Sequence, residues 1–74
     1  MWKEGTVNVD GDQFKYWMKY YDTGSVWGID HGKISKLMLK RENVIVANYD
    51  RGWDVEPVDE TTEAVVALLI KRDN

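Results

Sequence analysis

Hydrophobic and polar positions alternate on both sides of Asp10-Gly11, near the start of the chain. Residues 2–9 and 13–21 are therefore expected to be antiparallel strands, because Asp-Gly readily takes the positive φ angles of a two-residue hairpin turn. This turn sets Val7 opposite Phe14, and alternate side chains then point to opposite faces. The predicted core face comprises Val7, Val9, Phe14, Tyr16 and Met18, and the other face comprises Trp2, Thr6, Lys15, Trp17 and Lys19.

Turn residues and apolar runs then alternate as far as residue 49. Segments 22–25 and 30–33 are expected turns, because Asp bonds nearby backbone and Gly relieves strain in tight turns. A brief strand is expected between them, at 26–29. Two longer strands are expected at 34–41 and 44–49, and the second is the most β-prone part of the chain.

The register of this second pair of strands has two solutions. A two-residue loop at Glu42-Asn43 pairs Leu39 with Val46, whereas a three-residue loop with a bulge pairs Leu39 with Ile45. The bulged register is favoured because it gathers one apolar face. That face would comprise Leu37, Leu39, Ile45, Ala47 and Tyr49.

A helix is expected at about 60–72. Pro57 ends strand pairing upstream, and Asp59 is a suitable N-cap. Acidic residues occupy the first turn and basic residues the last, which complements the helix dipole. An apolar stripe should cover one face of the sheet, and it consists of Val65, Val66, Leu68, Leu69 and Ile70. The fold class is therefore α+β, with an antiparallel sheet of four to five short strands and one C-terminal helix packed on one face.

The chain has 74 residues, which predicts a single domain over 1–74. It contains no cysteine, so a disulfide cannot stabilise the fold. The start of the chain does not resemble a signal peptide, and the longest apolar run is too short to span a membrane. These features predict a soluble, cytoplasmic protein without membrane association.

The net charge of −3 disfavours general affinity for nucleic acid, but it is unevenly distributed. Residues 13–41 contain six basic and two acidic residues, whereas residues 42–74 contain three basic and eight acidic residues. The middle segment interleaves lysines with aromatic rings, a combination typical of single-stranded nucleic-acid binding. The candidate residues are Lys15, Trp17, Lys19 and Lys36. A solvated sheet face that blocks edge pairing is the favoured interpretation.

Segment 49–54 (Tyr-Asp-Arg-Gly-Trp-Asp) is expected to lead the chain off the sheet. Arg51 and Trp53, with the carboxylates Asp50 and Asp54, are candidates for a recognition surface because Trp and Arg are enriched at binding hot spots. The structural alternative, which is favoured, is that Trp53 fills the core between sheet and helix and Arg51 pairs with a nearby acid.

Three motifs resemble a family of short uncharacterised proteins from Gram-positive bacteria and their phages or mobile elements. These motifs are Gly-Ile-Asp-x-Gly-Lys-Ile-Ser-Lys-Leu at 28–37, Tyr-Asp-Arg-Gly-Trp-Asp at 49–54 and Trp-x-x-Gly at 2–5. The resemblance implies an accessory role in a mobile element, and it implies no activity, cofactor or catalytic residue.

Enzymatic chemistry has little support in the sequence. His31 could act as a base only if Asp30 oriented it, and neighbouring turn residues seldom do so. Asp50 and Asp54 have no fixed geometry in a loop. Neither a metal site nor a cofactor is expected, since the calcium-loop and phosphate-loop patterns both fail at required positions.

The leading hypothesis is a non-enzymatic domain that binds a protein partner. Nine aromatic residues exceed what one small core can bury, so Trp2 and Trp17 are expected on a free surface. Homodimerisation through that surface is a variant. Single-stranded nucleic-acid binding is the alternative, and an enzyme that uses Asp50, Asp54 or His31 is the third class.

Overall fold

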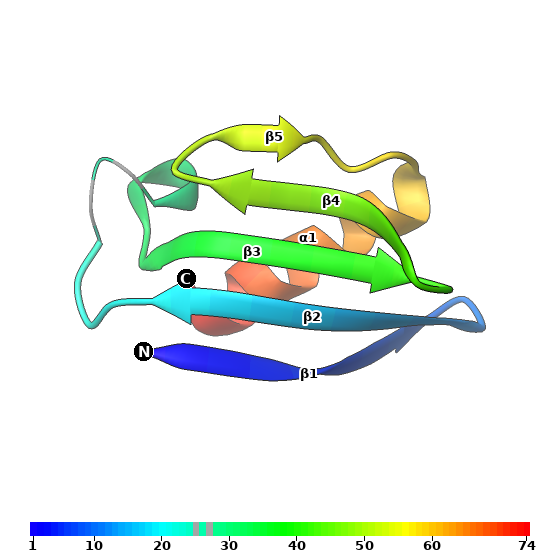
Figure 1. Cartoon of the computed structure of the whole chain (residues 1–74). Coiled ribbons are helices and arrows are strands. Elements are labelled where there is room, and N and C mark those ends of the chain that lie inside the picture. Colours follow the sequence, from blue (N-terminus) through cyan, green and yellow to red (C-terminus); the bar gives the residue numbers. More distant parts are fainter. Residues whose placement is uncertain (25, 27) are drawn as a thin grey trace.

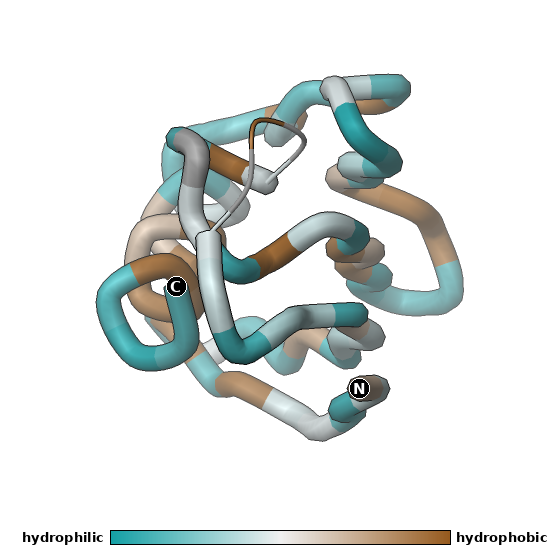
Figure 2. The backbone as a smooth tube through the Cα atoms, turned by 90° about the vertical axis from the view of Figure 1, so that its left-hand side faces the viewer, coloured by the Kyte–Doolittle hydropathy of each residue, from teal (hydrophilic) through white to brown (hydrophobic). Residues whose placement is uncertain are grey.

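The computed structural model describes residues 1–24, 26 and 28–74, with the side chain of His31 excepted. The chain forms a five-stranded antiparallel sheet in the order β1-β2-β3-β4-β5, followed by one helix, which confirms the α+β prediction (Figure 1). The elements are β1 (Trp2–Val9), β2 (Asp12–Tyr20), a 3-10 turn (Ile29–His31), β3 (Ile34–Arg41), β4 (Val44–Asp50), β5 (Trp53–Val55) and α1 (Glu60–Asp73). Seen along the strands, the sheet and α1 form two layers (Figure 2).

The β1–β2 hairpin has the predicted turn and register. Asp10 and Gly11 both have positive φ, 52° and 83°, as a type I′ turn requires. Val7 lies opposite Phe14, and every residue of the predicted core face lies on the side that faces α1. The two faces of this hairpin are therefore confirmed.

The β3–β4 hairpin has a two-residue loop and a bulge further along the ladder. Glu42 and Asn43 have φ of 53° and 65°, so the loop is again of type I′. A register shift after Leu39 then pairs Leu39 with Ala47, which makes both predicted registers wrong. The extra residue reverses the alternation along β4, so Ile45 lies on the face away from α1 and is 43% exposed.

The predicted brief strand at 26–29 is wrong for its described part, because Gly28 precedes a 3-10 turn that begins at Ile29. Ser25 and Trp27 lie outside the described residues. Asn74 holds this turn against the end of the helix. Its side-chain amide donates to the Ile29 carbonyl at 2.9 Å and accepts from the Ile34 N–H at 2.9 Å. The segment before β3 is thereby fixed to the helix layer.

Segment 49–54 does not lead the chain off the sheet, contrary to the prediction. It forms a tight hairpin, and Trp53–Val55 returns as the edge strand β5 beside β4. Arg51 has a φ of 59° in the turn, and its N–H donates to the Ser35 carbonyl at 3.2 Å. The chain leaves the sheet after Val55.

The helix begins at the predicted N-cap. The Asp59 carboxylate accepts from the Thr62 N–H at 2.8 Å, and α1 buries Thr62, Val65, Val66 and Leu69. These positions follow the helical period and form one stripe toward the sheet. Leu68 lies outside this stripe and is 42% exposed, so its predicted burial is wrong.

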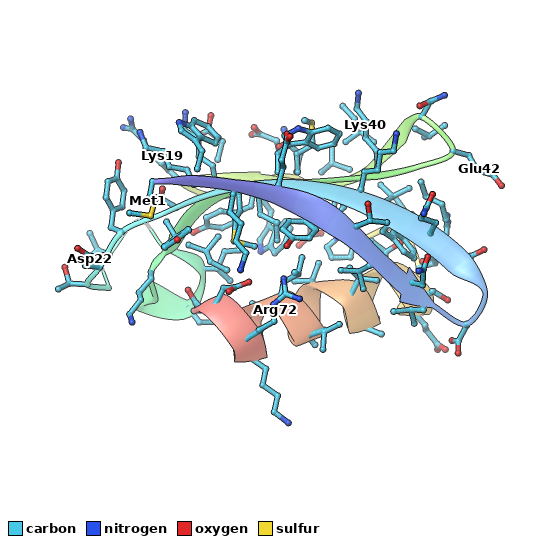
Figure 3. The ribbon with its side chains drawn as sticks, turned by 90° about the horizontal axis from the view of Figure 1, so that it is seen from below. Met1, Lys19, Asp22, Lys40, Glu42 and Arg72 are labelled. Carbon is cyan, nitrogen blue, oxygen red and sulfur yellow. The ribbon has the colours of Figure 1, made fainter. Side chains whose placement is uncertain are left out.

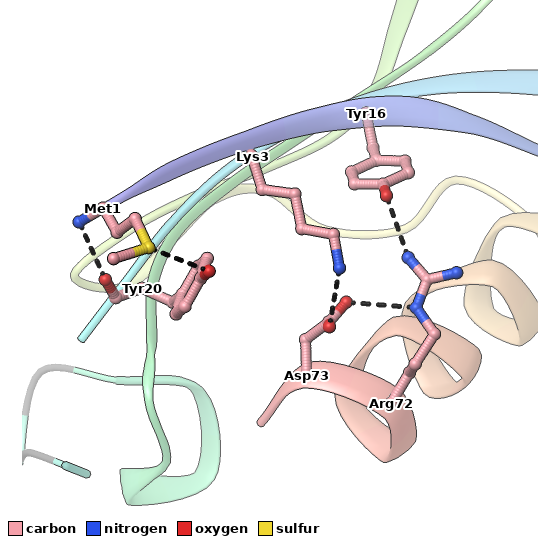
Figure 4. Close-up of polar contacts among 6 residues, drawn as sticks. All are labelled: Met1, Lys3, Tyr16, Tyr20, Arg72 and Asp73. Carbon is pink, nitrogen blue, oxygen red and sulfur yellow. Dashed lines mark hydrogen bonds and ion pairs between the residues drawn. The ribbon is translucent and has the colours of Figure 1, made fainter. Parts of the chain in front are cut away.

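Polar contacts connect the last turn of α1 to the sheet (Figure 4). Asp73 accepts from the Lys3 ammonium at 3.0 Å and from the Arg72 Nε at 3.2 Å. Arg72 also donates to the Tyr16 hydroxyl at 2.8 Å. Because these residues come from β1, β2 and α1, the network fixes the helix on one side of the sheet.

The first turn of α1 makes the stability sensitive to acid. Hydrogen bonds from the Thr62 hydroxyl and from Arg41 lower the pKa of Asp59 from 3.8 to about 2. A carboxyl whose pKa is lower in the folded state stabilises the fold at neutral pH, and this contribution is lost on protonation. We therefore expect the melting temperature to fall as the pH decreases from about 4 to about 2.

Asp59→Asn tests this expectation, since asparagine still caps a helix but cannot ionise. Its melting temperature should be lower than that of the wild type at pH 7 and should change less between pH 4 and pH 2, as measured by circular dichroism. Asp54→Asn is the control, because Asp54 is exposed and makes no ion pair in the described part of the chain. Equal pH dependence in all three proteins would contradict the assignment.

Candidate binding surface on the uncovered sheet face

The face of the sheet opposite α1 is not covered by any described element. Figure 3 shows Lys19 and Lys40 projecting from this face, whereas Arg72 lies between sheet and helix. The strand register arranges its side chains in three rows, and we call this set the uncovered face. The rows are Trp2-Lys19-Lys36-Asp50, Glu4-Trp17-Met38-Asn48 and Thr6-Lys15-Lys40-Ile45.

The uncovered face is basic although the chain as a whole is acidic. Its four lysines are opposed only by Glu4 and Asp50. The other eleven acidic residues of the chain lie in turns and loops, at the ends or edge of the sheet, and on α1. The objection that the net negative charge raises against an anionic ligand therefore does not apply to this face.

Lysines lie directly opposite one another at two places on this face. Lys15 pairs with Lys40, and Lys19 pairs with Lys36, across β2 and β3. Like charges in directly opposed positions destabilise a sheet. The Lys36 ammonium is partly compensated by Asp50 at 3.8 Å, where both side chains are largely hydrated. A bound anion would relieve the remaining repulsion.

Trp17 lies between the two lysine pairs. Its neighbours across the strands are Glu4 and Met38, and the Lys40 ammonium lies 5.7 Å from the centroid of its indole. The indole is half-buried, so its ring is held by the sheet and still reachable from solvent. A fixed and accessible ring suits stacking against a flat ligand.

A shallow hollow of about 170 Å³ adjoins Trp17 on this face. Trp2 and Trp17 both line it, and Met38 lies between their strands and β4. The polar groups at its border are the Asn48 amide, the Asp50 carboxylate and the Lys36 ammonium. The hollow therefore offers apolar walls and both donors and acceptors to a planar, polar-edged group.

The predicted partner-binding residues do not form a single surface. Trp2, Trp17 and Asp50 lie on the uncovered face. Trp53 instead packs edge-on against Tyr49, with ring centroids 5.1 Å apart, on the side of α1. It is 36% exposed, so it lies at the rim of the core and does not fill it as the favoured alternative required. The Asp54 side chain is exposed in β5.

The predicted nucleic-acid set stays together. Lys15, Trp17, Lys19 and Lys36 all lie on the uncovered face. The sequence interpretation missed Met38 and Asn48, which complete the row of Trp17. The pairing of β3 with β2 places Met38 beside Trp17, whereas the position of Asn48 depends on the register of β4, which is fixed by a bulge that has no sequence signature of its own.

The residues considered for catalysis lie on different elements: His31 in the 3-10 turn, Asp50 at the end of β4 and Asp54 in β5. His31 ends the 3-10 turn, while Asp50 pairs with Lys36. Within the described part of the chain, no group of three or more His, Cys, Asp and Glu side chains is arranged to hold a metal ion. In the part of the chain that the structure describes, no helix is long and apolar enough to cross a membrane.

Comparisons with known proteins give the family but no function. Neither the curated proteins nor the solved structures that were compared contain a match to this chain. A family model described as a domain of unknown function, DUF7678, matches residues 1–74. The family match agrees with the resemblance to an uncharacterised family. The origin in Gram-positive bacteria and the link to mobile elements stay predictions. The chain belongs to the DUF7678 family.

Proposed function

We propose that the protein is a non-enzymatic binding module that takes single-stranded nucleic acid on the uncovered face. One observation supports this most strongly: two directly opposed lysine pairs flank a half-buried indole. Such repulsion costs stability in the free protein and is relieved by a polyanion. A phosphate backbone supplies the negative charge, and Trp17 supplies the stacking surface between the lysine pairs.

Stacking requires a base whose π-face is free. In a duplex both faces of each base are covered by neighbouring bases, whereas a single strand can place a base on an exposed aromatic ring. The hollow between Trp2 and Trp17 offers such a place, with polar groups at its border for the edge of the base. Preference for single strands over duplex follows from this arrangement.

A protein partner, or a second copy of the chain, is the alternative occupant. Trp2 favours it, because this indole is 64% exposed at the β1 edge of the sheet. Charge separates the two cases, since lysine is depleted at the centre of protein interfaces and this face has four lysines against the two carboxylates of Glu4 and Asp50. We therefore place nucleic acid first and protein binding second, which reverses the order that the sequence favoured.

A salt titration tests the proposal. The logarithm of the affinity for a single-stranded oligonucleotide should fall with the logarithm of salt concentration with a slope of about −3, since each of four phosphate contacts contributes about −0.7. Replacing Lys15, Lys19, Lys36 and Lys40 with glutamine should remove most of the affinity and the slope. Fluorescence anisotropy of a labelled oligonucleotide measures both quantities.

The matched control is the double variant Lys33→Gln, Lys71→Gln, which alters exposed lysines in the loop before β3 and on α1. Its slope should equal that of the wild type. The four-lysine variant should remain folded, because the substitutions also remove the like-charge pairs. Absence of binding to any single strand at low salt, or equal slopes in all three proteins, would overturn the proposal and favour a protein partner.

A further inference from the structure

A second pocket lies at the end of the sheet where β2, the start of β3 and the β4–β5 turn meet. It has a volume of about 450 Å³, and its charged lining comprises Lys19, Lys36 and Arg51. Tyr21 and Thr23, two exposed residues with hydroxyl groups, also line it, whereas the lining residue Ser35 is buried and donates its hydroxyl to the Lys19 carbonyl at 3.3 Å. None of the described residues that line it carries a carboxylate, although the Asp50 carboxylate lies 3.8 Å from the Lys36 ammonium. The pocket is therefore rich in cations and in groups that can donate hydrogen bonds.

Arg51 has no partner for its guanidinium in the described part of the chain. It makes neither an ion pair nor a side-chain hydrogen bond there, whereas Arg41 and Arg72 are both paired with acids. The expectation from the sequence that Arg51 pairs with a nearby acid is therefore wrong. Its five N–H donors remain available to a ligand with several acceptor oxygens.

The backbone of Arg51 is held in an unfavourable conformation. Its φ of 59° is left-handed, a region that glycine adopts without cost and arginine does not. The Arg51 N–H bond to the Ser35 carbonyl, at 3.2 Å, places the residue beside the start of β3. Other residues of this chain, Glu42 among them, have a left-handed φ in an ordinary turn, so the conformation places Arg51 at the pocket and the case for a ligand rests on its unpaired guanidinium.

The two lysines of the pocket are also positioned. The Lys19 ammonium lies between two rings, 5.7 Å from the centroid of Trp2 and 5.5 Å from that of Tyr21. Lys36 lines this pocket as well as the hollow between Trp2 and Trp17. The pocket and the hollow are therefore adjacent, with Lys36 between them.

We infer that this pocket binds the dianion of a phosphate monoester. A phosphate monoester has a charge of about −1.5 to −2 at pH 7 and three acceptor oxygens, which matches three cations and the two hydroxyl residues Tyr21 and Thr23. For a nucleic-acid ligand the inference rests on the proposed function. When the terminal base of a single strand binds in the hollow between Trp2 and Trp17, its terminal phosphate would lie in the pocket. The same chemistry is present in a free nucleoside monophosphate.

Oligonucleotides with and without a terminal phosphate test the inference. At pH 7.5 a strand with a 5′- or 3′-phosphate should bind about tenfold more tightly than the same strand with a free hydroxyl. This ratio should decrease as the pH falls through about 6, where the phosphate takes up a proton. In Arg51→Gly the ratio should approach one, while the melting temperature should not fall. Lys71→Gln, a change of equal charge on α1, should retain the full ratio.

Calorimetric titration with a nucleoside monophosphate and with its nucleoside shows whether the phosphate ligand is a free monophosphate or the terminal phosphate of a strand. If oligonucleotides fail to bind but the monophosphate binds in a manner that depends on Arg51, the pocket is supported and the proposed function fails. If single strands bind with equal affinity with and without a terminal phosphate, the inference is overturned and the proposed function stands. Equal binding of nucleoside and nucleoside monophosphate would also overturn it.

Discussion

Replacing Phe14 with alanine is expected to lower the free energy of unfolding by about 3–5 kcal/mol. Phe14 is fully buried on the α1 side of β2 as a member of the core cluster, and the Arg41 guanidinium lies 5.3 Å from its ring centroid. The substitution leaves a cavity that a rigid sheet cannot close. A chain of this size has a total stability of about 4–11 kcal/mol, so the variant should be close to unfolding at room temperature.

Urea denaturation followed by circular dichroism measures this loss. Trp2→Ala is the control, because it removes a larger ring from an exposed position and should change the free energy of unfolding by less than about 1 kcal/mol. A loss below about 1 kcal/mol in Phe14→Ala would contradict the position of the core between α1 and β2.

The elements that the sequence predicts correctly are those with a local signal. Asp10-Gly11 sets the first turn, and the resulting alternation assigns Phe14 to the core and Trp17 to the opposite face. Asp59 marks the start of the helix in the same way, because its carboxylate caps the first turn. In both cases a few neighbouring residues determine the structure without help from distant contacts.

The elements that the sequence does not predict depend on distant contacts. The bulge after Leu39 follows from the pairing of two strands, and it moves Ile45 from the expected core face to the uncovered face. The edge strand β5 has only three residues, Trp53–Val55. Its Trp53 ring packs against the ring of Tyr49, which lies on the neighbouring strand β4. Short edge strands have too little pattern to be recognised from composition.

In the candidate site too, some features are predictable from the local sequence and others depend on how the strands pair. The composition of the middle segment identifies Lys15, Lys19 and Trp17, and alternation places them on one face. The opposition of Lys15 to Lys40 and of Lys19 to Lys36 appears only once β3 is aligned with β2. The net charge of the chain therefore understates the positive charge of this face, because the acidic residues of 42–74 other than Asp50 lie elsewhere.

Replacing Trp17 with alanine is expected to weaken binding of a single-stranded oligonucleotide by about 5- to 150-fold, since loss of a stacked base costs about 1–3 kcal/mol. Trp17 lies between the lysine pairs and borders the hollow, so its ring should contact a base directly. Trp17→Phe should recover part of the affinity because it keeps an aromatic face. Thermal denaturation of each variant ensures that the titrations compare folded proteins.

Trp53→Ala is the matched control, because it removes the same side chain from the α1 side of the edge strand β5. The most direct measurement is thus the ratio of oligonucleotide affinities of Trp17→Ala and Trp53→Ala in the same low-salt buffer. We expect Trp53→Ala to bind like the wild type and Trp17→Ala to bind at least about fivefold more weakly. Equal affinities of the two variants, or a larger loss in Trp53→Ala, would contradict binding on the uncovered face.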